Sequence, residues 1–124
     1  MKLVYIAGPY RADTPYEIER NIRRAEDLGL EVARNGAVPV IPHTMYRFFQ
    51  DSLPDDFWLD GTMEILRRCD AILMGPQWEE SAGSNSEFKE AEKLGLAIFY
   101  WQEDVMHASK KWFQFLGVDP KYST

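Results

Sequence analysis

The chain has 124 residues, of which 45% are hydrophobic and 27% are charged, a composition typical of one globular domain with a substantial core. Its formal net charge of −6 argues against duplex nucleic acid as the main partner, because phosphate binding needs a surplus of Lys and Arg. This charge still permits one small phosphate held by one or two arginines.

The compartment is indicated by what the sequence lacks. Cys69 is the only cysteine, so an intramolecular disulfide is impossible, which is typical of a reducing compartment. The apolar run at the start is too short for a signal peptide, and no stretch approaches the length of a membrane span. We therefore expect a cytoplasmic protein with no membrane partner, made of a single domain over residues 1–124.

The first predicted elements are a strand and a long helix. The apolar run from Leu3 to Ala7, closed by Gly8-Pro9, predicts a buried strand. A helix start follows, with Thr14 as the N-cap, Pro15 at the first helical position and Glu17 completing a capping box, and Gly36 ends the helix. The apolar residues that recur at helical spacing and would face a sheet are Ile18, Ile22, Ala25, Leu28 and Val32.

The middle of the chain is less regular. Residues 37–41 predict a second strand, which Pro39 places at an edge of the sheet or near its own end. The aromatic segment that follows, residues 43–54, has no clean period and is interpreted as a lid, a base-stacking wall or a subunit contact. A helix capped by Asp55 or Asp56 is then expected to run to about Arg68. Its apolar side would carry Trp58, Leu59, Ile65 and Leu66.

The last third returns to alternating strands and helices. Residues 71–74 and 96–101 predict two more strands. Between them, the sequence Ser84-Asn85-Ser86-Glu87 fits a capping box and predicts a helix from about Asn85 to Lys93, stopped by Gly95. Residues 103–116 predict a final helix that ends at Gly117. We therefore expect an α/β fold, a Rossmann-like (flavodoxin-like) three-layer sandwich with a parallel sheet of four to five strands.

Two strand ends carry polar residues that fit a ligand site. In Gly8-Pro9-Tyr10-Arg11, the glycine lets the backbone approach a ligand, and Arg11 could bind a phosphate or carboxylate, although a plain turn with a solvated arginine is also consistent. His43 follows the second strand, where ligand crevices form. Asp70 is interpreted as structural, accepting hydrogen bonds at a turn. We find no zinc spacing, Walker loop or dinucleotide fingerprint, and we expect neither metal nor cofactor.

The serine-glycine loop is the richest candidate for chemistry. Ser81, Gly83 and Ser84 offer hydroxyls and free N–H groups for an anion or a sugar oxygen, while Glu87 could act as a nucleophile or base. The competing interpretation is that Ser84 and Glu87 only cap the helix. Asp60 lies in the preceding helix, where a lone aspartate is usually a solvated surface residue and a functional role is the alternative.

Together these motifs resemble the nucleoside 2-deoxyribosyltransferase superfamily. The closest likeness is to small phage and bacterial domains that resemble deoxynucleoside 5′-monophosphate N-glycosidases. The resemblance covers Leu3 to about Tyr100 and depends on the order of the motifs. A glycine turn with Arg11 comes first, followed by an aspartate in a helix, a strand preceded by Asp70, and a serine-glycine loop that ends in glutamate.

This resemblance implies a role for each matched residue. Glu87 matches the nucleophile that attacks C1′ and forms a glycosyl-enzyme intermediate, and Asp60 matches the aspartate that binds the base and assists its departure. Arg11 matches the arginine that contacts the 5′-phosphate. Ser81 stands where transferases of free nucleosides tend to carry aspartate and nucleotide hydrolases carry serine. We therefore expect cleavage of the N-glycosidic bond of a nucleoside 5′-monophosphate, by hydrolysis or base transfer.

Two other classes of function remain open. The first is a non-catalytic nucleotide-binding module, such as a sensor or a phage accessory protein. The second is a structural oligomer in which Ser84 and Glu87 are only a cap. For the enzyme, the helix N-terminus is expected to keep Glu87 ionised at neutral pH. Because the family often completes its site from a neighbouring subunit, the aromatic-rich surface, including Trp112 and Tyr122, predicts a homo-oligomer, a dimer or tetramer.

Overall fold

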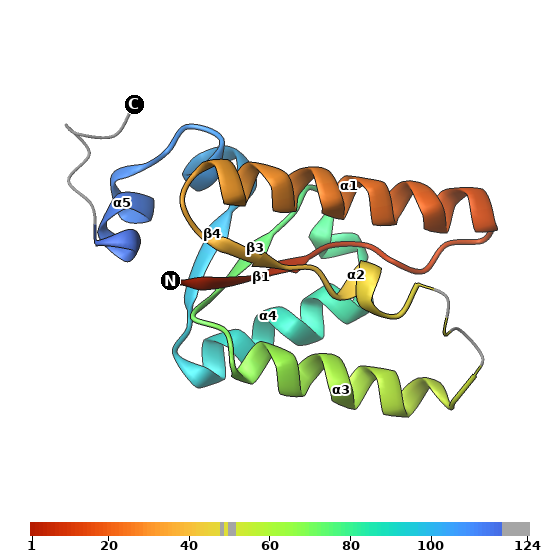
Figure 1. Ribbon diagram of the computed structural model, residues 1–124. Helices are drawn as coiled ribbons and strands as arrows, with labels where there is room; N and C mark the ends of the chain where they lie inside the picture. The colour runs from red at the N-terminus through yellow and green to blue at the C-terminus, as the bar shows by residue number, and fades with distance from the viewer. Residues whose placement is uncertain (48, 50–51, 118–124) are drawn as a thin grey trace.

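The protein is a single α/β domain built on a parallel sheet, seen in Figure 1 as a computed structural model that describes residues 1–47, 49 and 52–117. In this part of the chain the sheet has four strands in the order β2-β1-β3-β4, all parallel. The strands are β1 (Leu3–Ala7), β2 (Val38–Val40), β3 (Ala71–Met74) and β4 (Ala97–Tyr100). The predicted Rossmann-like fold class is thereby confirmed.

Helices cover both faces of the sheet (Figure 1). One face carries α1 (Pro15–Arg34), the π-helical turn η2 (Trp101–Val105) and α5 (Lys110–Leu116), and the other carries α3 (Asp55–Arg67) and α4 (Ala82–Leu94). Two short helices, α2 (Pro42–Met45) and η1 (Trp78–Glu80), lie in the connections. Alternate residues of β1 therefore enter different cores: Val4 and Ile6 pack on the α1 side, and Tyr5 and Ala7 on the α4 side.

The central position of β1 and β3 in the sheet explains why their sequences are continuously apolar. All four residues of β3 are buried, as expected of a parallel strand covered on both faces. The strand β2 is at the edge of the sheet, where Pro39 pairs in register with Val4 and its missing N–H costs no hydrogen bond to an outer neighbour. Asp70 accepts a hydrogen bond from the Leu3 amide at 2.8 Å, which confirms its structural role.

The helix α1 forms as its sequence predicts. The Thr14 hydroxyl accepts a hydrogen bond from the Glu17 amide at 3.2 Å, and Gly36 follows the helix with a φ of 98°, a conformation that glycine adopts without steric cost. Its inner face buries Ile22, Ala25 and Val32. None of the helices in the described part of the chain, α1 included, is long and apolar enough to cross a membrane.

The chain leaves β1 and β3 toward opposite faces of the sheet. After β1 it enters α1, and after β3 it enters α4 on the other face, so the two loops diverge and leave a crevice at the carboxyl edge. Gly75, directly after β3, is needed there for close packing. A Cβ at this position would lie 2.8 Å from Leu28 Cδ1 and 3.0 Å from the Ala7 carbonyl oxygen.

The helix α3 differs in detail from its prediction. Neither Asp55 nor Asp56 caps it, because the helix begins at Asp55 and the preceding Pro54 makes no side-chain cap hydrogen bond. Leu59, expected on or near the apolar side, is 49% exposed. The aromatic segment before α3 packs against Trp58, whose ring centroid lies 4.6 Å from that of Tyr46 and 5.9 Å from that of Phe49.

The predicted final helix over residues 103–116 is wrong, because η2 and α5 are separate. Asp104 is buried and accepts hydrogen bonds from the Tyr100 amide at 2.9 Å and from the Ser109 hydroxyl at 3.2 Å, while Ala108 has a left-handed φ of 48°. Trp112, expected at the surface, is fully buried. Tyr122 lies outside the described residues.

Candidate active site

Glu87 is held by the helix that starts beside the carboxyl end of β3. The helix α4 begins one turn earlier than predicted, because the Ser81 hydroxyl accepts the Ser84 amide N–H at 3.1 Å and is the N-cap. Ser84 is therefore not the cap but a buried residue of the first turn. Glu87 lies further along the helix and does not belong to the predicted capping box, which leaves its carboxylate available for another partner.

That partner is Tyr5, in the central strand β1. The Tyr5 hydroxyl donates a hydrogen bond to Glu87 Oε2 across the core between β1 and α4. Burial strongly raises the pKa of Tyr5, the negative charge of Glu87 raises it further, and the nearby Thr62 hydroxyl acts in the opposite direction. Tyr5 therefore remains protonated and serves as a permanent hydrogen-bond donor to Glu87.

Burial changes the charge state of Glu87. It raises the pKa of this carboxyl to about 7, against the smaller lowering by the Tyr5 hydrogen bond. The expectation that Glu87 stays ionised at neutral pH is therefore wrong, because burial moves its pKa up into the neutral range. Desolvation by the surrounding core outweighs whatever the helix N-terminus contributes. A carboxyl whose pKa lies near neutrality is typical of catalytic groups.

Sequence reasoning does not single out Tyr5 or Thr62. In the linear sequence Tyr5 is one more apolar residue of the buried strand Leu-Val-Tyr-Ile-Ala. The available signal is its hydroxyl, because a buried Tyr needs a hydrogen-bond partner. Nothing in the linear spacing shows that this partner is Glu87, 82 residues further along the chain.

The other residues of the serine-glycine loop surround the start of α4. The Ser84 hydroxyl is buried and has no hydrogen-bond partner within the described structure, and Ser84 precedes Glu87 by one turn on the same helix. Gly83 is exposed, with room around its backbone, because an added Cβ would meet nothing closer than the Ser81 hydroxyl at 3.9 Å. The loop therefore presents small groups beside the carboxylate.

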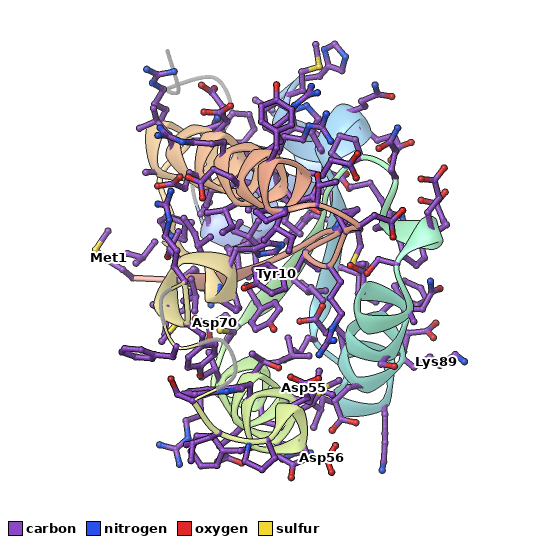
Figure 2. The ribbon with its side chains drawn as sticks, turned by 90° about the vertical axis from the view of Figure 1, so that its right-hand side faces the viewer. Met1, Tyr10, Asp55, Asp56, Asp70 and Lys89 are labelled. Atoms are coloured by element: carbon purple, nitrogen blue, oxygen red, sulfur yellow. The ribbon has the colours of Figure 1, made fainter. Side chains whose placement is uncertain are left out.

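Arg11 and Asp60 lie at the surface. Arg11 forms an ion pair with Asp55 at 2.8 Å, and both side chains are more than half exposed. Asp55 is the first residue of α3, so this pair links the β1–α1 loop to the helix that carries Asp60 and Thr62. Asp60 is exposed and has no hydrogen-bond or ionic partner in the described chain. Figure 2 looks onto the carboxyl edge, with Tyr10 above α3 and Asp55 at the end of that helix.

His43 and Tyr10 order the β1–α1 loop. His43 Nε2 lies 3.1 Å from the carbonyl oxygens of both Gly8 and Pro9, so it carries the proton and donates. Burial lowers the pKa of His43, which keeps the ring neutral. The Tyr10 ring packs edge-on against His43 at 5.8 Å between centroids, and the Asn21 amide donates to the Tyr10 carbonyl at 3.1 Å.

The candidate residues fall into two groups on opposite sides of the sheet edge. A cavity of about 390 Å³ opens on the α1 side, between the ends of β1 and β3, and its lining includes Gly8 and His43. Among the described residues, Glu87 and Ser81 do not line this cavity. They belong to the α4 side, with Tyr5. The structure thus joins Glu87 to a partner that was not predicted and assigns Gly8 and His43 to a separate hollow.

Comparisons with known proteins agree with this architecture. A family model described as a domain of unknown function (DUF7768) matches residues 2–101. No curated protein matches the chain. A solved structure of a 2-desoxiribosyltransferase from Leishmania mexicana is similar, with a TM-score of 0.57 and 22% identity. The alignment covers 81% of this chain but 63% of that protein, so the chain spans less than two thirds of its length. This likeness is one of fold.

Proposed function

The chain belongs to the DUF7768 family, and we propose that it cleaves the N-glycosidic bond of a nucleoside 5′-monophosphate with Glu87 as the nucleophile. The observation that supports this function is the pair of Glu87 and Tyr5, a part-buried carboxylate with a hydrogen-bond donor fixed in the central strand of a parallel sheet. The fold shared with a 2-desoxiribosyltransferase favours the same class of chemistry by analogy.

The reaction has two steps. One oxygen of ionised Glu87 bonds to C1′ as the bond between C1′ and the base nitrogen breaks, and the electron pair of that bond leaves with the base, which Asp60 protonates. Positive charge that develops on the sugar is stabilised by the carboxylate beneath it. Water then attacks C1′, frees Glu87, and returns a proton to the enzyme. A second base in place of water would give transfer.

Tyr5 has a positioning role in this scheme. Its hydroxyl binds one carboxylate oxygen, Oε2, which leaves the other oxygen for the attack on C1′. Because hydrogen bonding favours the ionised form, Tyr5 also opposes the effect of burial on the pKa of Glu87. Activity should therefore rise with pH through about 7 as Glu87 loses its proton.

The preference for a 5′-monophosphate depends on Arg11 and Ser81. Arg11 is exposed and bound only by the exposed carboxylate of Asp55, an ion pair of the kind worth less than about 1 kcal/mol, so a phosphate dianion could replace it. Ser81 is uncharged, so it does not repel the phosphate of the same ligand as an aspartate at this position would. Its hydroxyl caps α4, and the free amides of that first turn favour an anion.

The deciding experiment is base release from a panel of ribo- and deoxynucleoside 5′-monophosphates and the matching nucleosides, followed by chromatography. We expect release by the wild type and a loss of at least about a thousandfold in Glu87→Gln. Glu92→Gln, an exposed residue of the same helix, is the matched control and should keep full activity. Release that is equally fast in Glu87→Gln would overturn the role of Glu87.

A non-catalytic nucleotide-binding module is the second candidate. It is favoured by the cavity on the α1 side, which lies at the ligand-binding edge of the fold and does not include Glu87. This candidate predicts that nucleotides raise the melting temperature of the wild type and of Glu87→Gln equally, with no base released by either protein.

A further inference from the structure

The cavity on the α1 side has the size and position of a ligand site. Its volume of about 390 Å³ falls in the range of small-molecule pockets, and it lies where the loops after β1 and β3 diverge. Gln77, at its β3 end, adopts a left-handed φ of 64°, a conformation that non-glycine residues seldom adopt and that is enriched at functional sites. An added Cβ at Gly8 would meet nothing within 4 Å, so this wall of the cavity is open.

Two opposite charges line this cavity without being paired. Arg24 and Asp27 both belong to its lining and stand one turn apart on α1, a spacing of about 5 to 6 Å between Cβ atoms. Opposite charges at this spacing often pair, as Arg34 does with Glu31 on the same helix. Arg24 and Asp27 form no such pair, and neither has a partner elsewhere in the described chain. Every other arginine contacts a carboxylate or an aromatic ring.

The remaining lining is apolar or neutral. Leu28, Ala25 and the prolines at the two strand ends supply apolar surface. The other polar side chains of the lining are the amides of Asn21 and Gln77 and the imidazole of His43. The charges of Arg24 and Asp27 cancel, so the part of a ligand that contacts this pair needs no net charge. The lining suits a flat, uncharged molecule with apolar faces and a polar edge.

We propose that this cavity binds a neutral nucleobase through a lactam edge, a ring carbonyl beside a ring N–H, as in hypoxanthine or uracil. The Arg24 guanidinium donates to the carbonyl oxygen, and the Asp27 carboxylate accepts from the adjacent N–H. The apolar walls pack against the faces of the ring. The site lies across the sheet from Glu87 and does not depend on the chemistry proposed for that residue.

Adenine and hypoxanthine are a matched pair of probes. They differ at position 6, where adenine has an amino group in place of the carbonyl, and adenine has no proton on N1. Adenine bound in the same orientation would therefore place a donor against Arg24 and an acceptor against Asp27. We expect calorimetric titration of the wild type to show hypoxanthine and uracil binding at least about tenfold more tightly than adenine, the discrimination typical of one paired base edge.

Variants of α1 locate the site. Arg24→Gln and Asp27→Asn should each weaken hypoxanthine binding by about tenfold, and hypoxanthine should shift the side-chain amide NMR signals of Asn21 and Gln77. Arg23→Gln is the control, because Arg23 is the neighbouring exposed arginine, pairs with Glu19 and is outside the lining. Glu87→Gln should bind hypoxanthine as the wild type does, whether or not base release is ever observed.

Three results would overturn the proposal. The first is equal affinity for adenine and hypoxanthine, and the second is the absence of binding of any of the three bases. The third is binding that is lost in Glu87→Gln and kept in both Arg24→Gln and Asp27→Asn, which would place the base on the α4 side. A failure to release base in the enzyme assay would affect only the role of Glu87.

Discussion

At the scale of single residues, the balance between burial and charge at Glu87 matters most. The core around β1 and α4 raises the pKa of Glu87 to about 7, and Tyr5 supplies a hydrogen bond to the ionised form. The carboxyl is therefore costly to ionise in the folded protein, yet its proposed chemistry requires ionisation. Such a conflict between the requirements of function and those of stability is typical of active sites.

Replacement of Tyr5 tests its influence on this carboxyl. In Tyr5→Phe the ionised form of Glu87 loses its donor, so the pKa of Glu87 should rise and the acidic limb of kcat/KM should move to higher pH by about one unit. The measurement is the pH dependence of base release from pH 5 to 9. Thr44→Val, which removes a hydroxyl bonded to a local backbone carbonyl, should leave the limb in place. An unshifted limb in Tyr5→Phe would exclude the positioning role.

Glu87→Gln should show how much folding stability the wild type loses when the carboxyl of Glu87 ionises within the core. The pKa of Glu87 is raised above the unfolded value, so the native state holds a proton that the unfolded chain releases between pH 4.5 and about 7, and stability falls as pH rises through that window. The amide side chain of the variant carries no charge and lacks this pH dependence. We expect the variant to be more stable than the wild type by about 3 kcal/mol at pH 8 and nearly equal to it at pH 4.5.

Denaturant unfolding at pH 4.5 and pH 8 measures this difference. Glu92→Gln is again the control, since an exposed carboxylate of α4 should produce no comparable pH-dependent gain. If Glu87→Gln were less stable than the wild type at both pH values, the carboxylate would be a structural group rather than a strained functional one.

At the scale of elements, the N-cap of α4 sets the register of the helix and thereby the direction in which the Glu87 side chain points. The sequence Ser81-Ala82-Gly83-Ser84-Asn85-Ser86-Glu87 contains several residues that favour N-caps, and local spacing alone favours Ser84 because Glu87 follows it by three. In the folded chain the cap is Ser81. The buried position of Ser84 and the bond from Tyr5 to Glu87 agree with this register, in which both residues face the core.

Ser81→Ala should destabilise the protein by about 1 kcal/mol through loss of the cap, and base release should fall with it because the first turn of α4 loosens. Ser86→Ala, an exposed serine of the same helix, is the matched control and should change neither property. Thermal unfolding and the base-release assay together provide the readout. A larger loss in Ser86→Ala than in Ser81→Ala would contradict the assigned start of α4.

At the scale of the whole molecule, exposed apolar side chains gather on the segment from α2 through α3. The most exposed of them are Met45, Phe49, Leu53, Phe57 and Leu59, each between 47% and 55% exposed. Large apolar surfaces on soluble proteins often mark protein interfaces. The predicted homo-oligomer is therefore best placed at this surface, and not at Trp112, which is buried.

Phe57→Glu tests this placement. A charge at the centre of an apolar interface should dissociate the oligomer, whereas Tyr16→Glu, an equally drastic change at an exposed position on α1, should leave it intact. Size-exclusion chromatography with light scattering measures the mass of each protein, and circular dichroism confirms that both are folded. A monomeric wild type, or an oligomer unaffected by Phe57→Glu, would exclude an interface at this surface.

Elements whose signals are local can be predicted from the amino-acid sequence alone. β1 and β3 have their predicted bounds, α1 has its predicted cap, and Pro39 lies in an edge strand, because continuous apolar runs, caps and prolines act on neighbouring residues. The sequence also singles out Glu87, through its place after a strand and a serine-glycine loop. The catalytic role of Glu87 and the roles of Asp60 and Arg11 remain predictions.

The surroundings of those residues depend on how the chain packs. The partner of Glu87 comes from a strand 82 residues away, the pKa of Glu87 depends on the core built around it, and the break between η2 and α5 involves the burial of Asp104. Arg24 and Asp27 are ordinary charges on a helix until the ends of β1 and β3 enclose a cavity beside them. Burial and long-range pairing arise from tertiary packing, so they cannot be inferred from the spacing of residues along the chain.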